Sequence, residues 1–414
     1  MPKRAPRLLP LNIAVLLAAA GYGVTFPLLA IRLEQMGVSG WQLGLNAAMP
    51  AVGWIVGSAV MPRLQARYGI ASVTMGFLLL GLAGFAGVAL TQDYWVATAF
   101  RFVFGGGVGL FFRAIEYWIN GVSSDDVRGR NLSVYNVVFM LGIVAGSALQ
   151  PALGAEGWLV FAVVGALLAA ALLLMTLWPA ERPAPSVHDG FSVATLTAVP
   201  VAFLAILAYG LYESIPVYLT EVYALRNGLG NDVAAFTLTA AAIGNILFPI
   251  PIAVLSDRTS RLTPLVVCAL TAALSSLAIP FVVKDTMFFL ALIVIAAGAA
   301  GTIYSLALAM IGDRYQGAGL AVANATFGIV YAAGSIAGPL VNGLAIDTLQ
   351  SHGVMVAAAA IFGGLLLATG ALHVSAKPRS AEVALRLGVV TFTLRLALAN
   401  IARNPALADE SSFV

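Results

Sequence analysis

Long apolar runs separated by short polar connections dominate the chain. A helix needs about 20 apolar residues to cross the hydrocarbon core of a bilayer, and windows of that length predict twelve such helices. They cover residues 11–33, 42–62, 70–91, 95–119, 131–153, 158–178, 196–220, 233–255, 263–283, 287–311, 318–341 and 354–375. The pattern predicts an all-α integral membrane protein.

An internal repeat divides these helices into two halves. The segment "RGRNLSVYNVVFMLGIVAGSALQP" at 128–151 recurs as "QGAGLAVANATFGIVYAAGSIAGP" at 316–339, with nine identities at a constant offset of 188. This offset contains an even number of spans, so the chain returns to the same side of the membrane before the repeat begins. The two halves therefore have the same orientation. We therefore expect a six-helix bundle over 1–178, a cytoplasmic linker over 179–195, a second six-helix bundle over 196–375 and a cytoplasmic tail over 376–414.

The start of the chain has a second interpretation. Basic residues precede the first apolar run, and Ala18-Ala19-Ala20 could imitate the cleavage site of a secretory signal peptide. We expect a membrane span instead, because the two-fold symmetry needs this helix as the partner of the seventh.

The distribution of Lys and Arg predicts the topology. A cytoplasmic N-terminus assigns all but five of the 21 Lys and Arg residues to cytoplasmic connections, as the positive-inside rule requires. The exceptions are Arg32, Arg226 and Lys284 outside, and Arg101 and Arg113 in the membrane.

The net charge of +3 follows this topology and indicates no nucleic-acid partner. One cysteine and three scattered histidines predict neither a disulfide nor a metal site.

Several short motifs resemble those of the major facilitator superfamily. The family's loop after the second span resembles Gly-x-Leu-Ala-Asp-Arg-x-Gly-Arg-Arg. The C-terminal copy "AVLSDRTSR" keeps Asp257, Arg258 and Arg261, whereas "PRLQARYG" keeps Arg67 but has Ala66 in place of the aspartate. "RFVFGGG" resembles the fourth-span signature, and "EYWIN" resembles a Glu-Ser-Trp-Leu-Asn motif near the end of span four in a bacterial branch.

The resemblance implies the MFS fold of twelve helices in two pseudo-symmetric halves, and a monomer in the lipid bilayer of a bacterial cytoplasmic (inner) membrane with both termini inside. It implies alternating-access transport of a small organic molecule, without a cofactor or an enzymatic site. The chain has no nucleotide-binding motif, so we expect a proton gradient to supply the energy. A decayed antiporter motif in "GIVAGSALQP" slightly favours export. Two alternatives stay open, namely proton-coupled uptake of an organic anion or zwitterion, and a non-transporting assembly or lipid-handling protein.

Apart from Arg32 at the outer end of the first span, four charged residues lie within the expected spans, where charges are costly. Arg101 and Glu213 lie at similar depths, about 8 Å outward of the midplane. They are candidates for an outer gate or a proton-sensitive switch, although Arg101 is equally suited to hydrogen-bonding carbonyl groups. Arg113 and Glu116 share a helical face at a spacing of three. They form a neutralising pair, or Glu116 latches to Arg67, or both contact substrate or protons.

Polar aromatic residues complete the expected pathway. Tyr22 in span one, Tyr209 and Tyr212 beside Glu213, and Tyr304 in span ten fall on helices that line the central cavity in this family. Helix-to-helix hydrogen bonds would explain them equally well. Glu213 is the first candidate for the proton-coupling carboxylate, ahead of Glu116. Arg67, Asp257, Arg258 and Arg261 are expected to act in the gating loops.

The tail carries one further helical pattern. Between 382 and 404, apolar residues recur at spacings of three and four with polar residues largely on the other side. This pattern predicts an amphipathic helix on the inner membrane surface. A thirteenth span is disfavoured by Arg386 and Arg395, and a regulatory or partner-binding role stays open.

Overall fold

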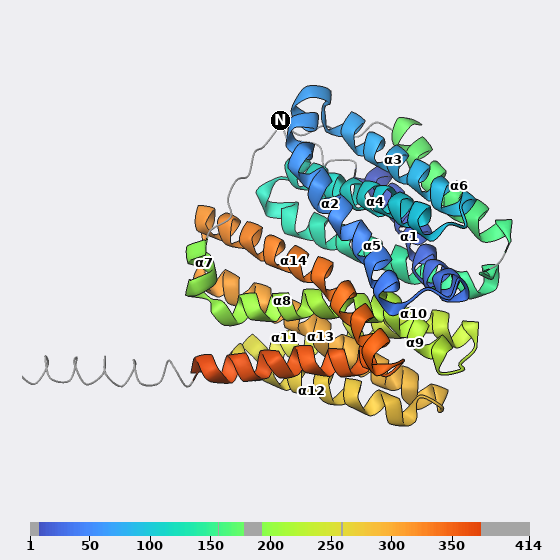
Figure 1. Ribbon diagram of the computed structural model, residues 1–414. Coiled ribbons are helices and arrows are strands. Elements are labelled where there is room, and N and C mark those ends of the chain that lie inside the picture. Colours follow the sequence, from blue (N-terminus) through green and yellow to red (C-terminus); the bar gives the residue numbers. More distant parts are fainter. Residues whose placement is uncertain (1–7, 156, 178–192, 258–259, 374–414) are drawn as a thin grey trace, which may run out of the picture. The chain divides into compact units, whose positions relative to one another are not determined.

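The computed structural model describes residues 8–155, 157–177, 193–257 and 260–373 (Figure 1). Every regular element in these residues is helical. The elements are α1 (Leu9–Gln35), α2 (Gly40–Tyr68), α3 (Ile70–Leu90), α4 (Tyr94–Val122), α5 (Asp125–Leu153), α6 (Trp158–Leu177), α7 (Val193–Ala198), α8 (Pro200–Ser214), η1 (Ile215–Leu219), α9 (Thr220–Arg226), α10 (Asn231–Leu247), α11 (Pro249–Asp257), α12 (Leu262–Val282), α13 (Thr286–Arg314) and α14 (Gly317–Leu349). A last helix covers Gly353–His373. Most of the expected linker, Arg258 and the expected helix 382–404 lie outside the described residues.

Within the described residues, twelve helices are long and apolar enough to cross a membrane, and each overlaps one of the expected runs. The prediction of an all-α protein with twelve spans is confirmed. The seventh span reaches Arg226 rather than residue 220, and the eleventh reaches Leu349 rather than residue 341. The extension of the seventh span brings Glu221, which the expected window left out, into a membrane-spanning helix.

Two prolines shape the seventh span. Pro200 occupies the start of α8, where its missing N–H is not needed. Pro216 lies in η1, a π-helical turn, and Thr220 donates both its backbone N–H and its hydroxyl to the carbonyl oxygen of Ile215. A bond to the fifth preceding residue widens the helix, and such wide turns are frequent at functional sites. The turn separates Glu213 from Glu221, and it carries Tyr218.

Matching helix caps show the two-fold pseudo-symmetry. The Asp93 carboxylate accepts the backbone N–H of Val96 at 2.9 Å at the start of α4, and Asp285 accepts that of Met287 at 3.0 Å at the start of α13. The two aspartates are 192 residues apart, the offset that aligns Gly106 with Gly298 in the same two spans. The halves also use equivalent contacts, since α4 packs on α2 and α3 as α13 packs on α10 and α12.

The halves meet along two pairs of helices. α2 packs against α14, and α5 packs against α10. Each pair joins a helix of the first six spans, blue to green in Figure 1, to one of the last six, green to red. This arrangement surrounds a central space with helices from both halves, and the candidate site lies there.

Repeated glycines allow α8 and α14 to pack closely. A Cβ atom on Gly334 would lie 2.8 Å from the carbonyl oxygen of Leu207 and 3.0 Å from Cα of Gly210. We expect Gly334→Ala to lower the free energy of unfolding by about 1–3 kcal/mol, because the backbones must move apart. Thermal melts of detergent-solubilised protein measure this. Gly328→Ala, in the same helix, is the control, since its Cβ would meet no atom within 4 Å. Equal melting temperatures for the two variants would contradict the prediction.

Candidate functional site

A cavity of about 440 Å³ lies among helices of both halves. Its volume falls within the range of small-molecule sites. Among the described residues that line it, Glu213 is the only charged one, and Ser214, Asn245 and Ser335 add polar groups. The aromatic lining residues are Tyr22, Phe26, Trp54, Phe112, Phe139, Tyr209, Tyr212, Tyr218 and Tyr331. The site is thus a wide aromatic chamber with a single carboxyl group.

The Glu213 carboxyl group is held by two hydroxyl groups of α14. Tyr331 Oη donates a short hydrogen bond to Glu213 Oε2, and Ser335 Oγ donates to the same oxygen at 3.4 Å. The internal repeat explains why only one half carries this arrangement. Ser335 repeats Ser147, but Tyr331 stands where the N-terminal half has Ile143. The two hydroxyl groups of α14 therefore fix the position of the Glu213 carboxyl group at the wall of the cavity.

Three tyrosines pack around this carboxyl group. The ring centroid of Tyr209 lies 5.4 Å from that of Tyr304 and 6.2 Å from that of Tyr331. The expected pathway residues Tyr22, Tyr209 and Tyr212 line the cavity, whereas Tyr304 is outside its lining and supports Tyr209 from α13. The tyrosine cluster therefore fixes the wall from which Glu213 projects.

Arg101 does not pair with Glu213 in this conformation, so a gate between these two residues stays a prediction for another state. The Arg101 side chain is 1% exposed, and its Nη2 donates to Tyr218 Oη at 3.0 Å. The guanidinium carbon lies 5.3 Å from the Tyr218 ring centroid, within cation–π range. The sequence could not reveal this partner, because depth along two helices does not fix which side chains meet. Arg101 thus joins α4 to the seventh span through η1, beyond the cavity.

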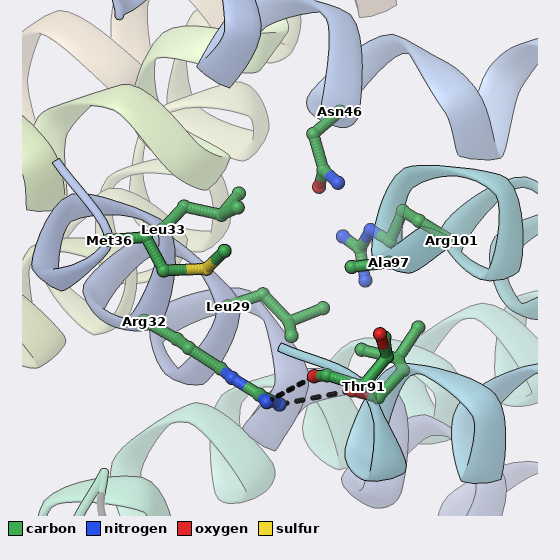
Figure 2. A pocket seen from close by; sticks show the side chains of 9 residues that line it. Leu29, Arg32, Leu33, Met36, Asn46, Thr91, Ala97 and Arg101 are labelled. Atoms are coloured by element: carbon green, nitrogen blue, oxygen red, sulfur yellow. Dashed lines mark hydrogen bonds between the residues drawn. The ribbon is translucent and has the colours of Figure 1, made fainter. Parts of the chain in front are cut away.

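Figure 2 shows the small space that separates Arg101 from Arg32. The space is about 20 Å³, and Asn46 and Thr91 also border it. Arg32 turns away from Arg101 and donates to the backbone carbonyl oxygens of Val88 and Thr91. The two arginines therefore keep separate partners, and neither lines the central cavity.

Arg113 and Glu116 form the ion pair that their spacing predicts. Arg113 Nη1 lies 3.0 Å from Glu116 Oε2, and the two side chains are 43% and 42% exposed. Neither residue lines the cavity. Glu116 thus pairs with Arg113 in this conformation. An ion pair between Glu116 and Arg67 stays a prediction for another state. The guanidinium carbon of Arg67 lies 5.2 Å from the ring centroid of its neighbour Tyr68.

The gating-loop residues of the C-terminal half are described in part. Arg261 Nε lies 2.9 Å from Asp313 Oδ2, and its Nη1 donates to Ser256 Oγ at 3.0 Å. Asp257 ends α11, but its side chain is outside the described atoms. Arg261 thus ties the loop after the eighth span to the end of the tenth.

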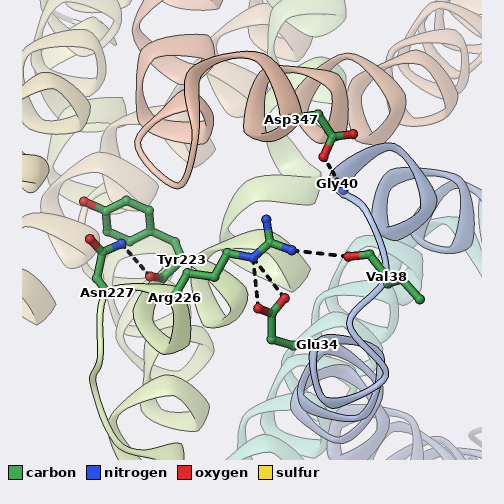
Figure 3. Close-up of polar contacts among 7 residues, drawn as sticks. All are labelled: Glu34, Val38, Gly40, Tyr223, Arg226, Asn227 and Asp347. Atoms are coloured by element: carbon green, nitrogen blue, oxygen red, sulfur yellow. Dashed lines mark hydrogen bonds and ion pairs between the residues drawn. The ribbon is translucent and has the colours of Figure 1, made fainter.

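The two halves are joined by ionic contacts at one end of the spans, which we call the closed end. It holds residues 34–41, 226–231 and 347–352. Arg226 Nε lies 2.9 and 3.0 Å from the two carboxylate oxygens of Glu34, and Figure 3 shows these contacts. Asp347 of α14 accepts the backbone N–H groups of Gly40 and Trp41 at 2.6 and 2.8 Å. An acid at a helix N-terminus binds free N–H groups, so Asp347 caps α2 from the opposite half.

The sequence reading missed Glu34, Tyr218, Glu221, Tyr331 and Asp347. Two signals were present in the sequence. Arg226 was assigned to the same side of the membrane as the connections that hold Glu34 and Asp347, and acids close to a lone arginine are natural partners. The comparison of Tyr331 with Ile143 in the repeat marked a change in polarity at one helix face.

Known proteins resemble this chain over most of its length. The family described as Major Facilitator Superfamily matches residues 11–226 and 201–408. The uncharacterized MFS-type transporter YfkF of Bacillus subtilis (strain 168) is 30% identical over 357 residues, which are 82% of this chain and 89% of YfkF.

Solved structures share the fold at low sequence identity. The nucleoside transporter NupG has a TM-score of 0.73 at 13% identity, covering 88% of this chain and 98% of that one. A D-xylose-proton symporter has a TM-score of 0.66 at 16% identity, covering 87% and 95%. The likeness to these two structures concerns the fold alone.

Proposed function

Because this chain belongs to the major facilitator superfamily, we propose that this multi-pass membrane transporter is a proton-coupled exporter of small aromatic organic cations. The observation that carries the proposal is a single carboxyl group, Glu213, in a chamber lined by nine aromatic residues. Aromatic faces attract cations, and the attraction strengthens when water is excluded. A cation that carries aromatic rings can thus contact both the carboxyl group and the aromatic side chains of the chamber.

The proposal differs from the anion or zwitterion alternative that the sequence left open. That alternative relied on Arg101 and Arg113 near the path. Neither residue belongs to the cavity lining, and each has a partner elsewhere. The polar groups around Glu213 also count against a non-transporting scaffold, for which a cavity without polar lining was expected.

Glu213 gives a simple means of coupling. An ionised carboxylate attracts an organic cation, and a protonated one does not, so the two ligands compete for one group. Competition makes the protein exchange protons for substrate, because each half-cycle carries one or the other. Inward proton flow then drives the cation outward. Glu116, half-exposed and paired with Arg113, is a weaker candidate for this role.

The closed end is proposed to face the outside of the cell. This orientation follows the sparse Lys and Arg residues on that side, with both termini in the cytoplasm. The structure then represents an inward-facing conformation in a bacterial inner membrane. Alternation requires the halves to rock about the central site, breaking the Glu34–Arg226 and Asp347–α2 contacts.

Proteoliposomes test the proposed function. With an acidic lumen and ethidium outside, we expect the protein to accumulate ethidium above the level of empty liposomes, and a protonophore to abolish the difference. An anionic dye such as fluorescein sulfonate is the matched control and is expected to stay at the background level. Accumulation indifferent to the pH gradient would exclude proton coupling, and accumulation driven only by an acidic exterior would indicate uptake by symport.

A further inference from the structure

Glu221 is a buried carboxyl group with no partner. It lies in α9, is 0% exposed, and neither of its carboxyl oxygens has a hydrogen-bond partner. An ionised carboxylate in such surroundings costs several kcal/mol, and the group avoids that cost by taking up a proton. Glu221 therefore holds a proton in this conformation.

Nearby charges do not neutralise Glu221. The main elements packed against α9 are α10, η1 and α1, and the apolar Phe289 of α13 lies against Tyr223. Tyr218 of η1 binds Arg101, Arg32 of α1 binds backbone carbonyls, and Glu34 binds Arg226. Asp232, the charged residue of α10, is exposed. On α9 itself, Tyr223 Oη lies 3.1 Å from His352 Nδ1. These groups have other partners or solvent, so protonation is the remaining way to remove the charge.

The position of Glu221 links it to the closed end. Along one segment of the seventh span, Tyr218 contacts Arg101 of α4, and Arg226 contacts Glu34 of α1. Both contacts join the two halves, and Glu221 lies between them in the chain, about 7.5 Å along the helix from Arg226. Opening this end must separate the contacts on either side of Glu221 and admit water to its carboxyl group.

We propose that Glu221 is a proton-binding site that couples protons to closure of this end. The closed form holds Glu221 protonated, and the opened form hydrates and ionises it, so the closed form binds one more proton. Lower pH therefore favours closure, and higher pH favours opening, by up to about tenfold in the population ratio per pH unit. The site goes beyond the proposed function, because it needs neither a substrate nor Glu213.

Thiol labelling of purified protein without substrate tests this site. Ala30 is 4% exposed and borders a small space with Arg101 and Tyr218, four residues before Glu34 of the closed end. In a Cys268→Ala background, Ala30→Cys is expected to react with a maleimide only when this end opens. The rate is divided by that of Asn231→Cys, an exposed position at the same end, to remove the pH dependence of thiol chemistry.

Between pH 5 and pH 8 we expect the normalised rate to rise with pH. With Glu221→Gln added, it stays low and flat, because the amide cannot ionise. With Glu213→Gln instead, it keeps its slope, which separates this site from the coupling proposed for the cavity. A flat wild-type profile, or an unchanged slope in Glu221→Gln, would overturn the proposal whether or not the protein transports ethidium.

The melting temperature of a second variant tests whether Glu221 is protonated in the closed form. Glu221→Met replaces an unpartnered polar group with an apolar chain of similar size. Because no hydrogen bond is lost, the melting temperature at pH 7 is expected to stay equal or rise. A fall of several degrees would show that the carboxyl group has a partner or a charge in the closed form, and would overturn the proposal even if Glu221→Gln failed to fold.

Discussion

Glu213→Gln is expected to lower ethidium affinity by about 30- to 150-fold and to abolish its dependence on a pH gradient. A charge-assisted contact contributes about 2–3 kcal/mol, and each 1.4 kcal/mol is a factor of ten. The amide oxygen can still accept from Tyr331 and Ser335, so the fold is preserved while the charge is removed. Equilibrium binding by fluorescence and counterflow in proteoliposomes measure the two effects separately.

Glu116→Gln is the matched control for this prediction. It removes the same charge from a half-exposed ion pair outside the cavity lining. Exposed ion pairs contribute little, so binding and pH dependence are expected to change by less than about threefold. If Glu116→Gln instead lost coupling while Glu213→Gln kept it, the central carboxyl group would be the wrong one.

The fold could be predicted from the pattern of apolar runs, because a helix is placed in the membrane by its overall hydrophobicity and not by particular side-chain contacts. Twenty apolar residues in a row specify a span whatever they contact, and a repeat at offset 188 specifies two similar halves. Even there, the end of span seven was placed too early. The apolar window ended at residue 220 and left Glu221 outside, whereas the helix continues past Pro216 and the π-helical turn to Arg226.

The site was predicted less well, because side-chain partners depend on helix rotation and tilt. Depth alone placed Arg101 and Glu213 at one level, yet Arg101 binds Tyr218 and Glu213 binds Tyr331. Local spacing was more reliable, since Arg113 and Glu116 lie on one turn and do pair. Contacts across the halves, such as Asp347 on the N-terminus of α2, need the packed structure to be seen.

The second large effect is expected at the closed end. Its contacts stabilise the closed conformation, so removing them is expected to open this end without unfolding the protein. Combining Glu34→Gln with Asp347→Asn is expected to raise Ala30→Cys labelling by about 30-fold. The ion pair is about one-quarter exposed, and Asp347 binds two backbone N–H groups of α2. Their loss is worth about 2 kcal/mol together, taking about 1 kcal/mol for a helix cap and about 1 kcal/mol for the pair.

A matched change at the same end distinguishes loss of closure from loss of any ionic contact. Lys284 donates to the carbonyl oxygen of Asn227 at 2.7 Å, and both belong to the C-terminal half. Lys284→Gln is therefore expected to leave labelling unchanged, because it breaks no contact between halves. The double variant opens the end by weakening the Glu34–Arg226 pair and the Asp347 cap on α2, so Glu221 is expected to become hydrated in it at every pH. Adding Glu221→Gln should then return labelling toward the wild-type level, which ties the proton site to the contacts that it is proposed to reinforce.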